Sequence, residues 1–294
     1  MNRRTADSNW TTRRLLEWTA EHLKRHGVDS PRLSSEMLLS HVLGVQRLKL
    51  YMDPDRPASE LERAAFRELV ERASQHEPVD YLVGQSSFFS MMFKVSPAVL
   101  VPRPSTETVV EHVIQHARRT PGFHNATIAD VCTGSGAIAV ALAKHMPHAR
   151  VIATDLYEDA LAIARENAKR HDVSDRIEFR HGNLLDALGS DRVQYLVSNP
   201  PYISDEEWDA VAPNVKDYEP VHALRSGVDG LRDLRVLIAH AREHLARPGQ
   251  VVFEIAASQK KAVLALAEEA DGLTNAHVLA DHEGLPRVLV ADAR

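Results

Sequence analysis

Residues 127–136 have the sequence Thr127-Ile128-Ala129-Asp130-Val131-Cys132-Thr133-Gly134-Ser135-Gly136. The apolar first half is typical of a buried strand, and the second half is a glycine loop that leads into a helix rich in Ala, Ile and Leu. Glycines allow the backbone to pass close to a ligand, and the free N–H groups at the start of a helix can donate to it. The stretch therefore indicates either a ligand-binding loop or a tight turn that binds nothing.

Two common cofactors fit this loop poorly. A dinucleotide fingerprint would have its first glycine where Cys132 stands. A phosphate-binding loop would continue with Gly-Lys-Ser or Gly-Lys-Thr, and this loop does not. NAD and ATP are therefore disfavoured.

Beyond the loop, strands and helices alternate to the end of the chain. Before the loop, Thr106-Glu107 start a predicted helix that continues through Ile114. After the loop, the sequence predicts strand 151–154, helix 159–170, strand 177–179, strand 195–198, helix 230–246, strand 250–255, helix 258–270 and strand 287–290. Such alternation is typical of an α/β protein with a doubly wound, Rossmann-like parallel sheet. Ligands of these sheets bind at the carboxyl ends of the strands, so the residues that follow each strand are the candidate site.

The residues after the second and third strands suit a nucleoside. Asp155 ends the second strand, where a carboxylate can accept two ribose hydroxyls. Dinucleotide enzymes and S-adenosylmethionine enzymes both place an acid there, and capping of the next helix is the other interpretation. Asn183 and Leu184 follow the third strand. Asn183 is a candidate for binding adenine, although an ordinary loop residue is an equal alternative.

The fourth strand ends in the tetrapeptide Asn199-Pro200-Pro201-Tyr202. The prolines have no N–H to donate, so they fix the backbone and leave carbonyl groups free as acceptors. An amide oxygen, a carbonyl and an aromatic face suit a planar –NH2 group, the nitrogen of an amide or an aromatic amine. A strand that ends at prolines beside a packed tyrosine is the purely structural alternative.

The order of these four sites favours methyl transfer. Glycine loop, acid, polar loop and tetrapeptide end successive strands, so all four are expected to face one crevice. A cofactor bound across the first three would present its reactive group to the fourth. For S-adenosyl-L-methionine this group is a methyl on a sulfonium.

The first part of the chain has a different pattern. Residues 1–78 are expected to form a small helical bundle that binds or positions a partner. Its first helix follows the cap at Thr11, its second ends at Gly44, and its third covers residues 61–73.

A connector is expected between the bundle and the α/β domain. Residues 79–104 hold short β-prone pieces, at 88–95 and 99–101, separated by prolines. They predict a β-hairpin or an extended connector. The α/β domain then covers residues 105–294.

Composition narrows the classes of protein. The chain has 294 residues, of which 44% are hydrophobic and 26% charged, as in a soluble globular protein. It has no apolar run long enough to span a membrane, and residues 1–7 lack the apolar core of a secretory signal. Cys132 is the single cysteine, which excludes an internal disulfide, and a reducing cytoplasm is expected. The sixteen histidines form no His-Glu-x-x-His motif, and no metal is predicted.

Charge is unevenly distributed. Residues 1–95 carry 14 Lys and Arg against 13 Asp and Glu, and the remainder carries 21 against 28. An acidic catalytic half disfavours nonspecific binding of nucleic acid, which needs a basic surface. A basic protein partner is still compatible with it.

Several motifs together resemble the N5-glutamine methyltransferases that modify translation release factors. The most specific are Pro102-Arg103-Pro104-Ser105-Thr106-Glu107 and the tetrapeptide at 199–202. Further similar stretches are 31–39, 77–84, 93–97, 99–101, 218–220 and 227–231. The resemblance extends over nearly the whole chain. The related ribosomal-protein enzymes share the catalytic half, while the run at 102–107 and the helical bundle are more similar to the release-factor branch.

The resemblance implies a class I methyltransferase sheet, S-adenosyl-L-methionine as cofactor, and a substrate. That substrate is the glutamine of the Gly-Gly-Gln loop in class 1 peptide chain release factors. It also implies that Cys132–Gly136, Asp155, Asn183, Leu184 and Asn199 bind the cofactor, while Asn199–Tyr202 bind the substrate and carry catalysis. A monomer that binds neither membrane nor nucleic acid directly is expected.

The chain departs from the family pattern at three places. Cys132 replaces the usual first glycine, Asn183-Leu184 stands where an acid and often an aromatic residue flank adenine, and Ala256-Ala257 stands where glycine is frequent. Three other functions stay open from the sequence: methylation of a ribosomal protein, methylation of adenine N6 in nucleic acid, and a scaffold without activity.

Overall fold

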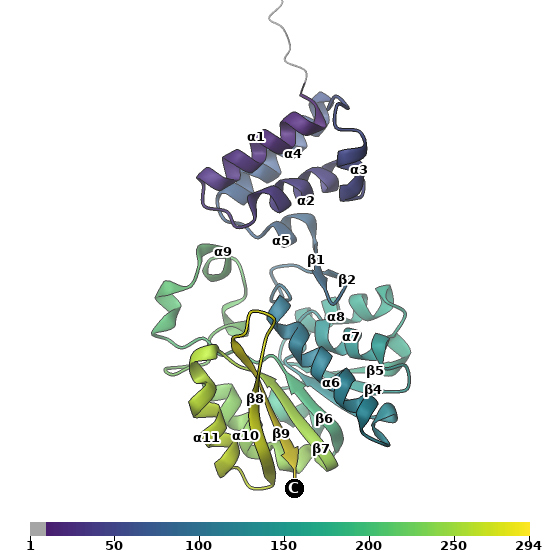
Figure 1. Ribbon diagram of the computed structural model, residues 1–294, viewed down its shortest axis with the longest axis vertical. Coiled ribbons are helices and arrows are strands. Elements are labelled where there is room, and N and C mark those ends of the chain that lie inside the picture. The colour runs from purple at the N-terminus through teal and green to yellow at the C-terminus, as the bar shows by residue number, and fades with distance from the viewer. Residues whose placement is uncertain (1–9) are drawn as a thin grey trace, which may run out of the picture. The chain divides into compact units, whose positions relative to one another are not determined.

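The computed structural model describes residues 10–294, which form two compact units (Figure 1). The first unit contains the described residues up to Gly84 together with Pro213–Tyr218, and the second contains Gln85–Ala212 and Glu219–Arg294. The expectation about a secretory signal at residues 1–7 lies outside the described residues.

The first unit is helical. Its elements are α1 (Thr12–Arg25), α2 (Pro31–Leu43), α3 (Arg47–Met52), α4 (Glu60–Ser74) and α5 (Val79–Val83), with α9 (Pro213–Lys216) from the later segment. The side chain of Thr11 caps α1, and Gly44 ends α2 with a positive φ of 62°, so both predicted helix ends are confirmed. The sequence did not predict α3 and α5, which are too short to show a helical period.

A leucine-rich core holds these helices together. Leu23, Leu38 and Leu39 are completely buried in it, and Phe66 of α4 packs on the same cluster. The later segment is joined to this unit by Tyr218, whose hydroxyl donates to the carbonyl of Gln75 at 2.8 Å. A piece of chain more than a hundred residues away in sequence therefore belongs to the helical unit.

The second unit begins with a hairpin, β1 (Gln85–Phe88) and β2 (Met91–Lys94). Asn167 of the helix α8 (Glu158–Arg170) exchanges two hydrogen bonds with the backbone of Lys94, at 2.7 and 3.0 Å, so the hairpin is fastened to this unit. The β-prone residues 99–101 form no strand. The N–H of Val101 donates to the carboxylate of Glu219 instead of to a neighbouring strand.

A mixed seven-stranded sheet within the described residues forms the centre of the second unit, in the order β5-β4-β3-β6-β7-β9-β8. The strands are β3 (Thr127–Val131), β4 (Arg150–Asp155), β5 (Ile177–His181), β6 (Val193–Ser198), β7 (Leu245–Glu254), β8 (Leu273–Ala280) and β9 (Pro286–Ala293). The first five of these in sequence are parallel to one another, as predicted. The sheet reverses its direction of winding between β3 and β6, which is where ligands bind in doubly wound folds.

The last two strands of the chain, β8 and β9, differ from the predicted all-parallel arrangement. β9 pairs antiparallel with β7 and with β8, and the sequence did not predict β8 at all. β8 lies at the edge of the sheet and alternates buried with exposed residues only weakly, so it has no clear strand pattern. Because β8 and β9 are joined by a short turn, they form a hairpin instead of a crossover.

Helices cover both faces of the sheet (Figure 1). One face carries α6 (Glu107–Arg119), α7 (Ala137–His145) and α8, and the other carries α10 (Arg232–His244) and α11 (Lys260–Glu269). Each face has its own buried apolar cluster, filled by Val, Ile, Leu and Ala. Within residues 10–294, no helix is long and apolar enough to cross a membrane.

Candidate active site

The register of the sheet brings three predicted sites together. Val131, the last residue of β3, pairs with Thr154 of β4 on one side and with Ser198 of β6 on the other. The glycine loop, Asp155 and Asn199 therefore follow three adjacent strands at the same edge. The prediction that successive strand ends face one crevice depends on this pairing.

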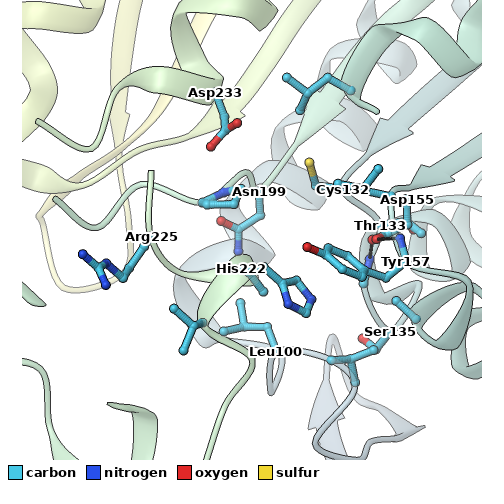
Figure 2. A pocket seen from close by; sticks show the side chains of 18 of the residues that line it. Leu100, Cys132, Thr133, Ser135, Asp155, Tyr157, Asn199, His222, Arg225 and Asp233 are labelled. Carbon is cyan, nitrogen blue, oxygen red and sulfur yellow. Dashed lines mark hydrogen bonds between the residues drawn. The ribbon is translucent and has the colours of Figure 1, made fainter. Parts of the chain in front are cut away.

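A cavity of about 960 Å³ lies at this edge (Figure 2). Most of the residues predicted from sequence line it: Cys132, Thr133, Gly134, Ser135, Asp155, Asn183, Leu184, Asn199 and Pro201. In the view of Figure 2, Asn199 and Asp155 lie on opposite sides of a pair of aromatic rings, Tyr157 and His222. This volume is at the upper end of the range for small-molecule sites.

Three predicted residues do not line the cavity. Gly136 is the N-cap of α7 with φ of 78°, and a Cβ there would lie 3.0 Å from the Cβ of Ala164, so a close helix contact explains the glycine. Pro200 is buried behind Asn199. The hydroxyl of Tyr202 points to Glu254, at 3.5 Å.

The glycine loop is held in place by hydrogen bonds to a buried acid, Asp130. Asp130 Oδ2 accepts the hydroxyl of Thr133 at 2.6 Å and the N–H of Ala139 at 3.0 Å. Within the described residues, its Oδ1 is buried without a hydrogen-bond partner. Burial raises the pKa of Asp130 to about 7.

Cys132 occupies a backbone conformation that favours glycine. Its φ is 61°, in the left-handed region, which gives a physical reason for the glycine expected at this place in the family. Burial raises the pKa of its thiol, with the negative charges of Asp155, Asp233 and Asp130 adding to the effect. The thiol therefore stays protonated and is a poor nucleophile.

Asp155 is placed to bind hydroxyls. Its Oδ2 accepts the N–H of Gly134 at 2.8 Å, and its Oδ1 accepts the N–H of Tyr157 at 3.0 Å. Burial raises its pKa, and these N–H donors oppose the shift. Each carboxylate oxygen can accept a further bond, so two adjacent hydroxyls of a ribose would be matched by two acceptors.

Apolar and aromatic residues border the same part of the cavity. Leu156 and Leu184 line it together with Asn183, which suits the two faces and the edge of a flat base. The rings of Tyr157 and His222 lie against each other (Figure 2) and stack, with their ring centres 3.5 Å apart. Burial lowers the pKa of His222, which favours the neutral ring.

Asn199 is oriented by one hydrogen bond. Its Nδ2 donates to Thr106 Oγ1 at 3.1 Å. Among residues 10–294, neither Asn199 Oδ1 nor the carbonyl of Pro200 has a hydrogen-bond donor. Asn199 lines the cavity, so its Oδ1 is an available acceptor of the kind expected for an –NH2 group, whereas Pro200, with its unpaired carbonyl, does not line the cavity.

The backbone after the tetrapeptide is fixed by its neighbours. Gln259 Nε2 donates to the carbonyls of Tyr202 and Gly230, at 2.9 and 3.1 Å. The N–H groups of Tyr202 and Ile203 both donate to the carbonyl of Leu224. The segment that carries His222 is therefore joined to the tetrapeptide.

Comparison with known proteins identifies the family. The family model described as PrmC N-terminal domain matches residues 14–84, and the one described as Methyltransferase small domain matches residues 104–216. A release factor glutamine methyltransferase of Geobacter sulfurreducens is 40% identical over 95% of this chain and 96% of its own. One of Rhodopirellula baltica is 40% identical over 96% of each chain. The chain belongs to the release factor glutamine methyltransferase family.

The fold agrees with this membership. A methyltransferase structure from Pyrococcus furiosus superposes with a TM-score of 0.50, at 16% identity, over 70% of this chain and 90% of its own, a likeness of fold alone. The predicted Rossmann-like class I methyltransferase fold with an N-terminal helical region is confirmed. As a member of the release factor glutamine methyltransferase family, the protein is an S-adenosylmethionine-dependent methyltransferase.

The residues of the cavity fit this cofactor. Asp155 offers acceptors for a ribose, Leu156 and Leu184 offer apolar faces for a base, and the glycine loop allows a close approach of the backbone. Pairs of histidines four residues apart occur at His22 and His26, at His112 and His116, and at His240 and His244. Within the described residues, however, no group of three or more His, Cys, Asp or Glu side chains is placed to hold a metal ion.

The sequence gives little indication of several residues at this site. It places Thr106 only at the start of a helix and Glu254 only within a strand. A charged residue inside the apolar run 251–255 was the available signal, because a carboxylate is rarely buried there without partners. Tyr157 and His222 gave no signal, since no local pattern relates them.

Proposed function

We propose that this protein methylates the side-chain amide nitrogen, N5, of the glutamine in the Gly-Gly-Gln loop of class 1 peptide chain release factors. Two relatives named release factor glutamine methyltransferase match it over nearly their whole length, the helical N-terminal part included. The single observation that carries the chemistry is Asn199, which lies one strand away from the glycine loop with an unpaired acceptor.

In this proposal Asn199 and Pro200 hold the acceptor nitrogen. An amide nitrogen is a poor nucleophile because its lone pair is delocalised into the carbonyl. Asn199 Oδ1 and the Pro200 carbonyl accept its two N–H bonds, and these bonds strengthen as positive charge develops on the nitrogen. When bound, S-adenosylmethionine supplies the methyl group on a sulfonium.

The other residues of the tetrapeptide contribute packing. Pro201 lines the cavity beside Asn199, and Tyr202, whose hydroxyl points to Glu254, is proposed to support the tetrapeptide from outside the cavity lining. The residues Cys132–Gly136, Asp155, Asn183, Leu184 and Asn199 are proposed to hold the cofactor. The main acceleration would come from alignment of methyl and nitrogen. No general base is required before attack, because the nitrogen becomes acidic as the methyl is transferred.

The proposed function implies a cellular compartment and a class of substrate. A protein that acts on release factors works in the cytoplasm, and the acidic second half disfavours nucleic acid as the substrate. We also expect a monomer.

One labelling experiment tests the substrate. The protein is incubated with methyl-labelled S-adenosylmethionine and, in parallel, with a class 1 release factor, ribosomal proteins or DNA. Label is expected on the release factor only, and it should disappear when the glutamine of the Gly-Gly-Gln loop is replaced by alanine. Label on a ribosomal protein or on adenine would overturn the proposal in favour of that substrate.

A further inference from the structure

A buried carboxylate beside the tetrapeptide is not used in the chemistry above. Glu254, the last residue of β7, is completely buried. It accepts the hydroxyls of Thr106 at 2.5 Å and Ser105 at 3.0 Å, and more weakly that of Tyr202 at 3.5 Å. Burial raises the pKa of Glu254, while the hydroxyl donors Thr106 and Ser105 and the charge of Arg287 oppose this shift and favour the ionised form. Hydroxyl donors are what a buried carboxylate needs to remain stable.

This carboxylate determines the direction of the next hydrogen bond. A hydroxyl has a single proton, and Thr106 donates it to Glu254. Thr106 Oγ1 can therefore only accept from Asn199, which must approach with its –NH2 group. The Asn199 amide is thereby held with Nδ2 toward Thr106, and Oδ1 is left as the atom available to a substrate.

The opposite orientation of Asn199 would not hold the acceptor nitrogen in line with the methyl group. A flipped side chain would present N–H donors to the N–H groups of the acceptor amide, which repel each other. An unrestrained Asn can rotate between both orientations at little cost, because neither amide orientation is intrinsically preferred. The hydroxyl of Thr106 removes this freedom.

We propose that Thr106, with its proton committed to Glu254, is a positioning residue for methyl transfer: it fixes the Asn199 amide so that Oδ1 meets the acceptor nitrogen. This inference rests on the proposed function, because it assumes an amide acceptor. Ser105 provides a matched control, since it donates to the same carboxylate, while the hydrogen bond of Asn199 within the described residues goes to Thr106.

Three variants separate positioning from support of the fold. Thr106→Val keeps the shape of the side chain and removes the hydroxyl, Thr106→Ser restores the hydroxyl, and Ser105→Ala removes the neighbouring hydroxyl. For Thr106→Val we expect kcat with a release factor to fall by at least about tenfold. KM for the release factor and the dissociation constant of S-adenosylmethionine should change by less than about threefold. Thr106→Ser should recover kcat to within about threefold, and Ser105→Ala should lose far less than Thr106→Val.

A double-mutant cycle tests whether Thr106 acts through Asn199. If it does, adding Thr106→Val to Asn199→Ala costs less than about twofold further, because the group being positioned is gone. Full additivity of the two losses overturns the inference. So does a loss in Ser105→Ala equal to that in Thr106→Val, because it would indicate a general effect on Glu254.

A spectroscopic measurement is independent of the substrate. The side-chain amide of Asn199 gives a pair of proton–nitrogen NMR signals that is identified by its absence in Asn199→Ala. One proton should exchange slowly in the wild type and rapidly in Thr106→Val. Exchange that is the same in the wild type and in Thr106→Val overturns the inference, even if the release factor is the substrate. If exchange is slow in the wild type and rapid in Thr106→Val, but the enzyme does not methylate a release factor, then only the proposed function and its catalytic consequence are overturned.

Discussion

At the scale of single residues, Asn199 is the residue on which the proposed chemistry depends most. Replacing it with alanine removes an acceptor that faces a developing positive charge. We expect Asn199→Ala to reduce methyl transfer by about a hundredfold or more, which corresponds to about 3 kcal/mol. Single-turnover kinetics with labelled cofactor measure the loss. Asn125→Ala is the control, because Asn125 is exposed and is distant from Asn199 in the sequence. Near-normal turnover of Asn199→Ala would remove the basis of the assignment.

Asp130 gives the stability of the protein a defined pH dependence. Burial raises its pKa to about 7, whereas an unfolded aspartate has a pKa of about 3.9. Between these values the native protein retains a proton that the unfolded chain releases. The free energy of unfolding therefore falls as the pH rises from about 4 to about 7, and this contribution is constant above that range.

The variant Asp130→Asn should lack this contribution, because an amide does not titrate. Urea unfolding of both proteins at several pH values between 4.5 and 8 measures it. As the pH rises, the unfolding free energy of the wild type should fall relative to that of the variant. Parallel curves for the two proteins would show that Asp130 is ionised in the native state throughout this range.

At the scale of elements, the approach of α10 to the tetrapeptide depends on one glycine. Gly230, just before α10, has φ of 72°, and a Cβ there would lie 2.2 Å from the carbonyl of Tyr202 and 2.7 Å from Gln259 Nε2. These are the groups that hold the backbone after the tetrapeptide. Any side chain at this position must displace them.

The variant Gly230→Ala should therefore reduce both stability and activity. Gly284→Ala is a matched control, because Gly284 has φ of 80° but open space around its Cβ position. The control should cost about 1 to 2 kcal/mol, the strain of a left-handed alanine, and keep its activity. Gly230→Ala should cost more and lower kcat at least about tenfold. Equal behaviour of the two variants in thermal unfolding and methyl transfer would contradict a steric role.

Helices and strands were predicted correctly from the sequence where the apolar pattern extends over many residues. Four or more residues are buried in each of the predicted strands β3, β4, β6 and β7 and the predicted helices α6, α7, α8 and α10. Prediction failed for α3, α5 and β8, and for residues 99–101. Short helices and an edge strand bury too few residues to impose a period, while Val99 and Val101 are buried without forming a strand.

At the scale of the whole molecule, the apolar cores of the two units are separate. Cofactor binding is expected to stabilise only the second unit, whose residues line the cavity. S-adenosylmethionine at a hundred times its dissociation constant should add about 2.7 kcal/mol to that unit. Calorimetry should then show a rise in one unfolding transition and not in the other.

Hydrogen exchange identifies which unit is protected. Protection should increase in residues 85–212 and 219–294 and stay unchanged in the helical unit. Asp155→Ala should abolish the shift, since it removes the acceptors for the ribose. A uniform shift of all transitions, or a shift that persists in Asp155→Ala, would contradict this picture of the site.

The sequence by itself determined the parallel part of the sheet, the glycine loop, the acid and the tetrapeptide, because each is a local pattern within about ten residues. Only the tertiary structure decided which of these patterns meet. Thr106 and Glu254 are 148 positions apart, and they become neighbours because β7 pairs with β6 and the start of α6 lies over their ends. The same holds for Pro213–Tyr218, which belongs to the helical unit. Contacts at such separations depend on the pairing of strands and the packing of helices, which no local period encodes.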